Sequence, residues 1–225
     1  MNYLIEELVK DNLITKSNVR DFILKNPKRQ VRIGALLSQN YIEKSQFYQY
    51  ILQKLRVGDL SFDSIDALSK EDVNSVELYE FIAQNLNIEY IDLQNIEIDS
   101  SLLDKIPTSI LLKNRIVITE EDDIYIHVVF ADPFDMAAQD AVSRFFPNKI
   151  IKKALSSFES INEKLMQIET YESLKIYIQD IKEDLKSTSH NDEDESPAVL
   201  KLIELILKSS ILARASDIHI EVSEK

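Results

Sequence analysis

The chain has 225 residues, 44% of them hydrophobic, and its formal net charge at pH 7 is −13. This length can form one large domain or two small ones. An acidic chain repels phosphate backbones and anionic lipid, which argues against nucleic acid as a partner and against direct insertion into a membrane. With no cysteine and three histidines, neither a disulfide nor a nucleophile–base pair can be assembled, and we expect no catalytic residue and no metal site.

Glycine occurs at two positions, Gly34 and Gly58, and neither is followed by a lysine–serine or lysine–threonine pair. A phosphate-binding loop needs several glycines to direct backbone N–H groups at the phosphate, so we expect no ATP binding by this chain. The first apolar stretch contains Glu6 and Glu7, unlike a secretion signal. Charges also interrupt every apolar stretch before the roughly 20 residues that cross a bilayer. The prediction is a soluble, cytoplasmic chain.

Residues 1–86 show apolar side chains at helical spacing and predict a subdomain of short helices. Two stretches resemble each other, LITKSNVRDFILKN from Leu13 and YIEKSQFYQYILQK from Tyr41, and a looser copy starts at Asp72. In each copy an apolar pair precedes a polar segment, whose serine could cap the amphipathic helix that follows. The alternative is that short helical hairpins resemble one another by chance.

Residues 87–182 change to β-branched runs and predict a small α/β subdomain. Glu121, Asp122 and Asp123 suit a hairpin turn, and Asp135 suits a helix cap better than a catalytic or phospho-accepting role. The fold class expected for the chain is α+β. The expected elements are strands at 89–93, 115–119, 123–132 and 149–154, with helices at 136–146 and from 161 to about 171.

Residues 183–197 predict a flexible acidic linker, because the segment 187–196 contains no apolar side chain. After it, residues 198–225 predict one amphipathic helix and the strand SDIHIEV at 216–222. A lone helix and strand are not stable, so this end must pack on the rest of the chain or belong to a further domain.

Two stretches resemble the ATPases that power type II secretion and type IV pilus assembly, the GspE and PilB family. The run ARASDIHIE at 213–221, with its preceding helix, resembles the opening of their second amino-terminal domain. The run from Leu78 through IDSSLLDKIPTSILLKNRIVI to VVFADPFD resembles their first amino-terminal domain. The resemblance implies that 198–225 is the truncated start of the second domain. It also implies a homo-hexameric cytoplasmic motor whose core, which binds ATP and Mg, lies beyond Lys225, so that this chain is not itself an enzyme.

Some members of that family bind cyclic di-GMP through two tandem motifs that each begin with Arg-Leu-Gly. Arg32 and Gly34 resemble one degenerate copy, because an arginine can hold a phosphate and a glycine permits close backbone approach. The motif departs from the family at Asn40 and Lys54, and the second copy has Asp63, Ser64 and Ile65 instead of Arg-Leu-Gly. We therefore expect cyclic di-GMP to bind weakly or not at all, and we assign Arg32 and Gly34 to a helix start and to tight packing. Cyclic di-GMP sensing is the alternative function.

The leading interpretation is a docking and regulatory region. It would couple the motor to a platform or anchoring protein of the inner membrane and so lie at that membrane through its partners. Phe47, Tyr48 and Tyr50 lie within four residues of one predicted helix, where successive side chains point about 100° apart. We expect Tyr48 to be exposed and to act as the protein-binding anchor. The sequence leaves open whether the machine secretes enzymes, builds pili or takes up DNA.

Overall fold

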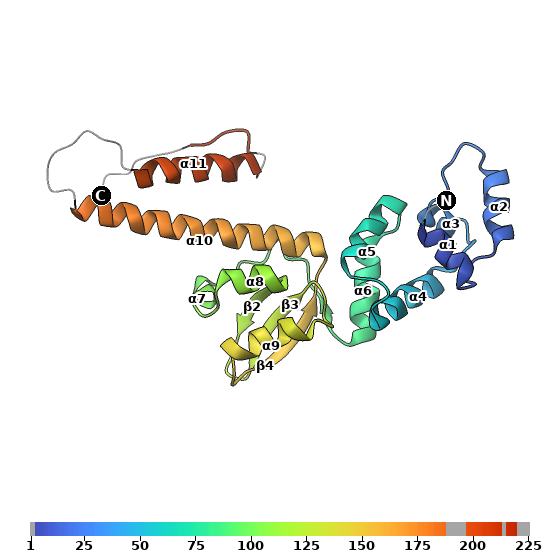
Figure 1. Cartoon of the computed structure of the whole chain (residues 1–225), viewed down its shortest axis with the longest axis horizontal. Coiled ribbons are helices and arrows are strands. Elements are labelled where there is room, and N and C mark those ends of the chain that lie inside the picture. The colour runs from blue at the N-terminus through green and yellow to red at the C-terminus, as the bar shows by residue number, and fades with distance from the viewer. Residues whose placement is uncertain (1–2, 188–196, 213–214, 220–225) are drawn as a thin grey trace. The chain divides into compact units, whose positions relative to one another are not determined.

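The computed structural model describes residues 3–187, 197–212 and 215–219. It divides into two compact units, one that extends to Lys164 and one that begins at Leu165. The first unit contains both a helical part and a sheet, so the predicted α+β class is confirmed. Figure 1 labels the elements in chain order.

The helical part packs its short helices around one apolar core. The core includes Phe22, Leu36, Phe47, Ile51 and Ile82, each fully buried. The helices are α1 (Tyr3–Lys10), α2 (Lys16–Lys25), α3 (Ile33–Ser38), α4 (Lys44–Val57), α5 (Asp63–Ala67) and α6 (Ser75–Leu86), with a 3-10 turn at Leu68–Glu71 between α5 and α6.

The three similar stretches each form a helix, namely α2, α4 and α6, but the predicted serine caps are wrong. The capping positions are Thr15, Glu43 and Asn74. The side chains of Thr15 and Asn74 accept hydrogen bonds from the backbone N–H of the third residue along, at 3.1 and 3.3 Å. In each helix the serine therefore lies in the first turn, after the capping residue.

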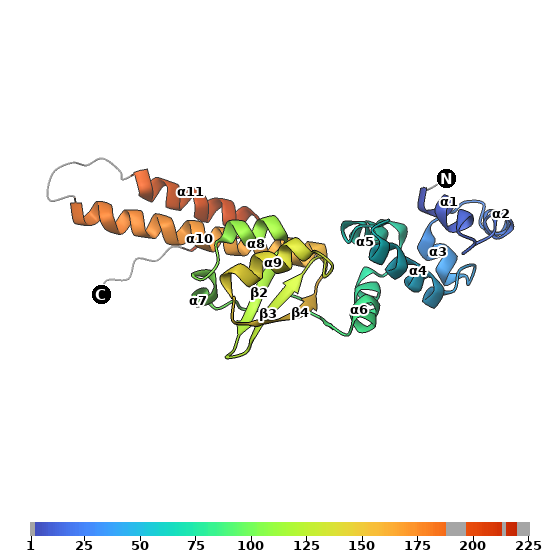
Figure 2. The ribbon, with the colours of Figure 1, turned by 60° about the horizontal axis from the view of Figure 1, so that its bottom comes forward.

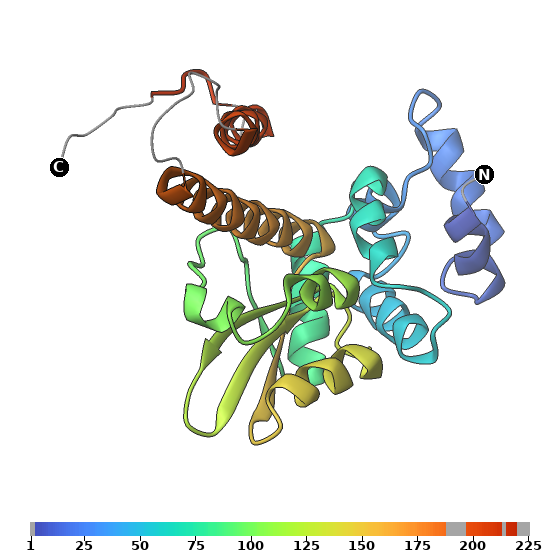
Figure 3. The ribbon, with the colours of Figure 1, turned by 60° about the vertical axis from the view of Figure 1, so that its left-hand side comes forward.

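The sheet has four strands in the order β1-β4-β3-β2. Strands β2 (Ile116–Glu121) and β3 (Tyr125–Phe130) form an antiparallel hairpin whose turn is fixed by Asp122, since its carboxylate accepts from the N–H groups of Ile124 and Tyr125. Strand β4 (Ile150–Leu155) pairs in parallel with β3 and with the two-residue strand β1 (Glu89–Tyr90). Figure 3 shows β2, β3 and β4 as a twisted sheet.

Helix α9 (Met136–Phe145) is the crossover between the parallel strands β3 and β4. The Asp135 carboxylate accepts a hydrogen bond from the Ala138 N–H at 3.0 Å, so its predicted capping role is confirmed. Helix α8 (Thr108–Asn114) packs against α9, and Figure 2 shows both on one face of the sheet. Neither α8 nor the short α7 (Ser100–Leu103) was among the predicted elements.

The carboxyl-terminal elements differ in length from those predicted. Helix α10 (Phe158–Ser187) extends well beyond Tyr171, and α11 covers Pro197–Leu212. Residues 188–196 of the predicted linker lie outside the described residues. Of the strand predicted at 216–222, residues 216–219 are not in a strand and the rest lies outside the described residues. Within the described residues, no helix is both long enough and apolar enough to cross a membrane.

A partly buried hydrogen-bond cluster joins the helical part of the first unit to the segment that follows its sheet. The hydroxyl of the fully buried Tyr79 on α6 donates to the Asp66 carboxylate at 3.0 Å and accepts from the Phe158 N–H at 3.4 Å. The other Asp66 oxygen accepts from the Glu159 N–H at 3.1 Å. Both acceptors therefore satisfy N–H groups in the first turn of α10, which have no partner within the helix. Burial raises the pKa of Asp66 and of Tyr79.

Replacing Tyr79 with phenylalanine is expected to lower the free energy of unfolding by about 1–2 kcal/mol, since Asp66 and the Phe158 N–H each lose a buried partner. Urea unfolding followed by circular dichroism measures this loss. Tyr125→Phe is the matched control, because Tyr125 is 39% exposed, and its effect should stay within about 0.5 kcal/mol. Equal losses in the two variants would contradict the role of the cluster.

Candidate functional site

Arg32 lies at the amino-terminal cap of α3 and its side chain is bound within the chain. One guanidinium nitrogen lies 3.1 and 3.2 Å from the two carboxylate oxygens of Asp72. Asp72 follows the 3-10 turn and has a left-handed backbone with φ of 59°. Arg32, the candidate phosphate-binding residue of the sequence analysis, is therefore already paired with a carboxylate.

The close approach of Asp72 also requires a glycine at position 34. A Cβ atom at this position would lie 2.0 Å from the backbone oxygen of Asp72 and 2.8 Å from its Cβ. No side chain fits there unless the backbone around Asp72 moves. The geometry thus agrees with the expectation of a helix start and tight packing at Arg32 and Gly34.

A hollow of about 690 Å³ opens beside this pair, lined by Arg29, Gln30, Arg32, Gly34, Ala35, Ser38 and Asp72. A dinucleotide phosphate placed against Arg32 would have to displace or face the Asp72 carboxylate, which opposes binding. At the position of the second family motif, the Asp63 carboxylate pairs with Arg115, at 2.9 and 2.8 Å. The structure therefore brings no second basic residue from that stretch to the hollow.

The expectation that Tyr48 is exposed is wrong, because only 5% of this residue is accessible. Its ring centroid lies 5.5 Å from that of Phe81 on α6 and 6.1 Å from that of Phe47. Its hydroxyl donates to Glu77 at 3.4 Å, and burial raises its pKa. Phe47, Tyr48 and Tyr50 are all buried because α4 is covered on more than one side, so aromatic side chains that point in different directions all find neighbours.

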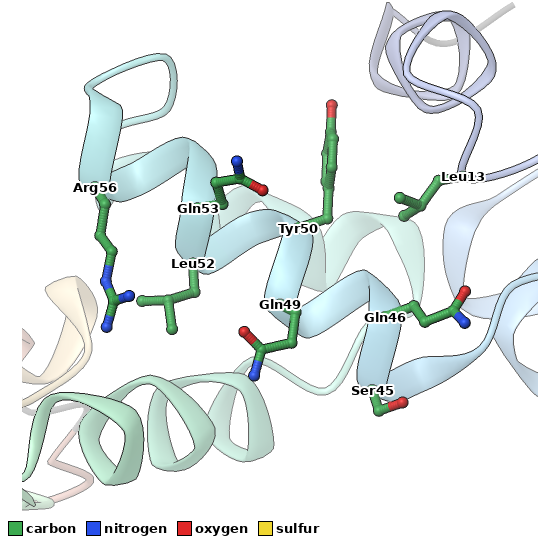
Figure 4. A pocket seen from close by; sticks show the side chains of 8 residues that line it. All are labelled: Leu13, Ser45, Gln46, Gln49, Tyr50, Leu52, Gln53 and Arg56. Carbon is green, nitrogen blue, oxygen red and sulfur yellow. The ribbon is translucent and has the colours of Figure 1, made fainter.

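A second hollow, of about 650 Å³, runs along the exposed side of α4 (Figure 4). Its lining residues are Leu13, Ser45, Gln46, Gln49, Tyr50, Leu52, Gln53 and Arg56. We call this surface the α4 groove. Gln49, Leu52 and Arg56 point toward the neighbouring helix α6, where Gln49 lies 3.5 Å from the Asn85 amide oxygen and Arg56 lies 3.4 Å from the Asn85 carbonyl.

The groove is neutral along most of its length, in a strongly acidic chain. Gln46, Gln49 and Gln53 are exposed, and their amide groups each offer donors and acceptors without a charge to desolvate. The Tyr50 hydroxyl is not available to a ligand, since it donates to Asp11 at 2.8 Å, and burial raises its pKa to about 12. The groove is suited to hydrogen bonding with another polypeptide.

Sequence reasoning missed this row of amides. The signal was present, because Gln46, Gln49 and Gln53 follow one another at spacings of three and four residues, which places them on one side of a helix. Tyr48 is buried in this stretch, and the adjacent Gln49 is exposed. Among the described residues, no group of three or more His, Cys, Asp or Glu side chains is placed to hold a metal ion.

Gly34→Ala is expected to lower the free energy of unfolding by about 3 kcal/mol or more, because the new methyl group overlaps backbone atoms. Gly58→Ala is the matched control. Gly58 has φ of +78°, but a Cβ atom added there would have no other atom within 4 Å, so only the backbone strain of about 1 kcal/mol applies. Thermal and urea unfolding of both variants distinguish them, and a Gly34→Ala protein as stable as wild type would contradict the packing role.

Calorimetric titration with cyclic di-GMP is expected to show no site of low-micromolar affinity, because the Arg32 guanidinium is bound to Asp72. Asp72→Ala releases that arginine and tests whether the carboxylate is what prevents binding. A low-micromolar site in the unmodified chain that Arg32→Ala abolishes would contradict this prediction.

Comparison with known proteins finds similarity to a domain family over part of the chain and to a curated relative over most of it. The model of the MshEN domain matches residues 86–172. The type IV pilus assembly ATPase PilB of Myxococcus xanthus (strain DK1622) is 25% identical over 232 residues, which cover 98% of this chain and 35% of that protein. The chain thus spans about a third of the length of this curated relative.

Two solved structures show weaker likeness. A structure of MshE with cdg has a TM-score of 0.38 and 15% identity, covering 74% of this chain and 99% of that one. The N-terminal domain of XpsE has a TM-score of 0.38 and 16% identity, covering 60% of this chain and 91% of that one. Both TM-scores are too low to establish a shared fold. The chain is thus similar to the MshEN domain over residues 86–172 and, along nearly its whole length, to the type IV pilus assembly ATPase PilB.

Proposed function

We propose that this chain is the docking and regulatory region of an assembly ATPase, and that it binds the cytoplasmic part of a platform or anchoring protein of the same machine. The similarity to an assembly ATPase extends over 98% of the chain, which supports a role inside such a machine. The chain itself acts by binding and not by hydrolysis. ATP, Mg and the contacts of a hexameric ring belong to the remainder of the whole protein.

The α4 groove is the observation that carries the docking proposal. A bound polypeptide needs partners for its backbone N–H and C=O groups, and a row of amide side chains provides both kinds. Leu13, which is partly exposed, supplies apolar surface beside the amides. Because Gln46, Gln49 and Gln53 are uncharged, a partner loses little free energy by desolvating them.

The net charge adds a preference for the partner. A chain of charge −13 attracts a partner that has a basic patch, and the attraction speeds association at low salt. This long-range effect does not select the docking site, which the short-range contacts of the groove determine. Association with the inner membrane follows in this proposal from the position of the partner.

Biolayer interferometry against the cytoplasmic segments of the platform and anchoring components tests the proposal. The double variant Gln49→Ala/Gln53→Ala is expected to weaken binding by at least about tenfold, because hydrogen bonds at the centre of an interface are lost. Both side chains are exposed, so the melting temperature should not change.

The control is Gln94→Ala, which removes an exposed amide of the sheet-containing part of the unit. Failure of the unmodified chain to bind any segment at low salt would defeat the docking function. Binding that is equally strong in the double variant would defeat the assignment to the α4 groove.

A further inference from the structure

Positive charge is concentrated in one short segment of this acidic chain. Residues 16–32 contain six basic residues and the single acidic residue Asp21, a local charge of +5. Since the whole chain has a charge of −13, the other residues together carry −18. The net charge of the chain therefore does not show that its positive charge is concentrated in residues 16–32. This segment comprises α2 and the loop that connects α2 to α3.

Two of the six basic side chains are engaged within the chain. Lys25 pairs with Asp21 at 2.7 Å, and Arg32 pairs with Asp72. Asp21 also accepts a hydrogen bond from the Tyr41 hydroxyl at 2.7 Å. The remaining four, Lys16, Arg20, Lys28 and Arg29, are exposed and form no ion pair with the acidic residues that the structure describes.

Helix α2 exposes apolar side chains on the same side as these cations. It packs on the core through Val19 and Phe22, while Ile23 is 47% and Leu24 is 73% exposed. Lys16, Arg20 and Leu24 follow one another at four-residue spacing, so they share one stripe of the helix. Leu24 does not pack in the core of the helical part, because α2 contacts that core through its opposite side.

The loop after α2 continues the positive surface. Asn26 caps the carboxyl end of the helix, and the Arg29 N–H donates to the Asn26 carbonyl at 3.0 Å, which turns the chain directly after α2. Lys28 and Arg29 lie in that turn. Figures 1 and 2 both place α2 at the edge of the helical part, beside α1 and α3.

This combination matches the chemistry of an anionic lipid surface. Arginine and lysine contact lipid phosphates through long side chains, while leucine and isoleucine between them enter the headgroup region. Binding of a free anion or of a nucleic acid would require the positive charges but would not require the exposed leucine beside them. Charges more than about 10 Å away are screened at 0.1 M salt, so the acidic remainder does not cancel the local attraction. Its repulsion from the lipid also favours orientations in which α2 faces the membrane.

We propose that the exposed side of α2, with the turn that contains Lys28 and Arg29, binds the surface of anionic phospholipid membranes. The contact is peripheral, with Leu24 and Ile23 entering the headgroup layer. It is independent of the α4 groove and of any protein partner. Four cations make it weak for a single chain and strongly dependent on salt.

Vesicle co-sedimentation of the 225-residue chain tests this proposal without any other protein. Binding is expected to phosphatidylcholine vesicles that contain about 30 mol% phosphatidylglycerol, and it should be lost in pure phosphatidylcholine or at about 0.5 M salt. Arg20→Glu/Arg29→Glu should weaken binding at least about tenfold, and Leu24→Ser should weaken it severalfold.

The matched control is Lys113→Glu/Arg144→Glu, which changes the net charge equally on the exposed surface of α8 and α9 and should retain binding. Circular dichroism verifies that each variant remains folded. No binding to the anionic vesicles, equal binding to pure phosphatidylcholine, or an equal loss in the control would overturn the proposal. Binding to heparin or RNA as tight as to vesicles, and unchanged by Leu24→Ser, would overturn it in favour of a general polyanion site.

Discussion

The Asp66 carboxylate connects two parts of the first unit, the helical part and the segment that follows the sheet. It accepts from the Tyr79 hydroxyl on α6 and from the Glu159 N–H at the start of α10, so one side chain joins the helical part to the segment that follows β4. The nearby Arg115 reinforces the junction, because it pairs with Asp63 and lies 4.5 Å from the centre of the Phe158 ring. Partly buried polar clusters of this kind favour one arrangement among the many that apolar packing alone would allow.

The difference between net and local charge changes how this chain is understood. Net charge predicts solubility and long-range steering, and on that basis an acidic chain has no affinity for anionic surfaces. Only structure shows which cations are already neutralised, as Lys25 and Arg32 are, and which face solvent, as Arg20 and Arg29 do. The electrostatic part of a contact with lipid or protein depends on the charges within about one Debye length of it, so the local charge matters more than the net charge of the chain.

Much of the fold could be predicted from the sequence, because apolar spacing alone distinguishes the helices of residues 1–86 from the strands that follow. The resemblance carried by the run from Leu78 to VVFADPFD is confirmed by the MshEN match. What could not be predicted depends on contacts between distant residues. The burial of Tyr48 requires α6 to cover a second side of α4, and the pairing of Arg32 requires Asp72, forty positions away, to approach Gly34. Short helices such as α7 carry too few residues to show a period.

The two proposed surfaces share one core but differ in the side chains that they use. Phe22 of α2 makes an edge contact with Tyr41, just before α4, at a centroid distance of 5.7 Å. Tyr41 in turn donates to Asp21, so α2 is fixed to the segment that leads into α4 by an apolar contact and a polar one. A well-packed core of this kind transmits little when exposed side chains such as Gln49 or Arg20 are changed.

Lipid contact through α2 and protein contact through α4 can therefore act simultaneously. If the partner is anchored in the membrane, the two contacts reinforce each other through effective concentration, because binding at one surface restricts the chain to the neighbourhood of the other. A weak lipid contact would then matter most for orientation, since it limits the directions in which the chain can face while its partner is bound.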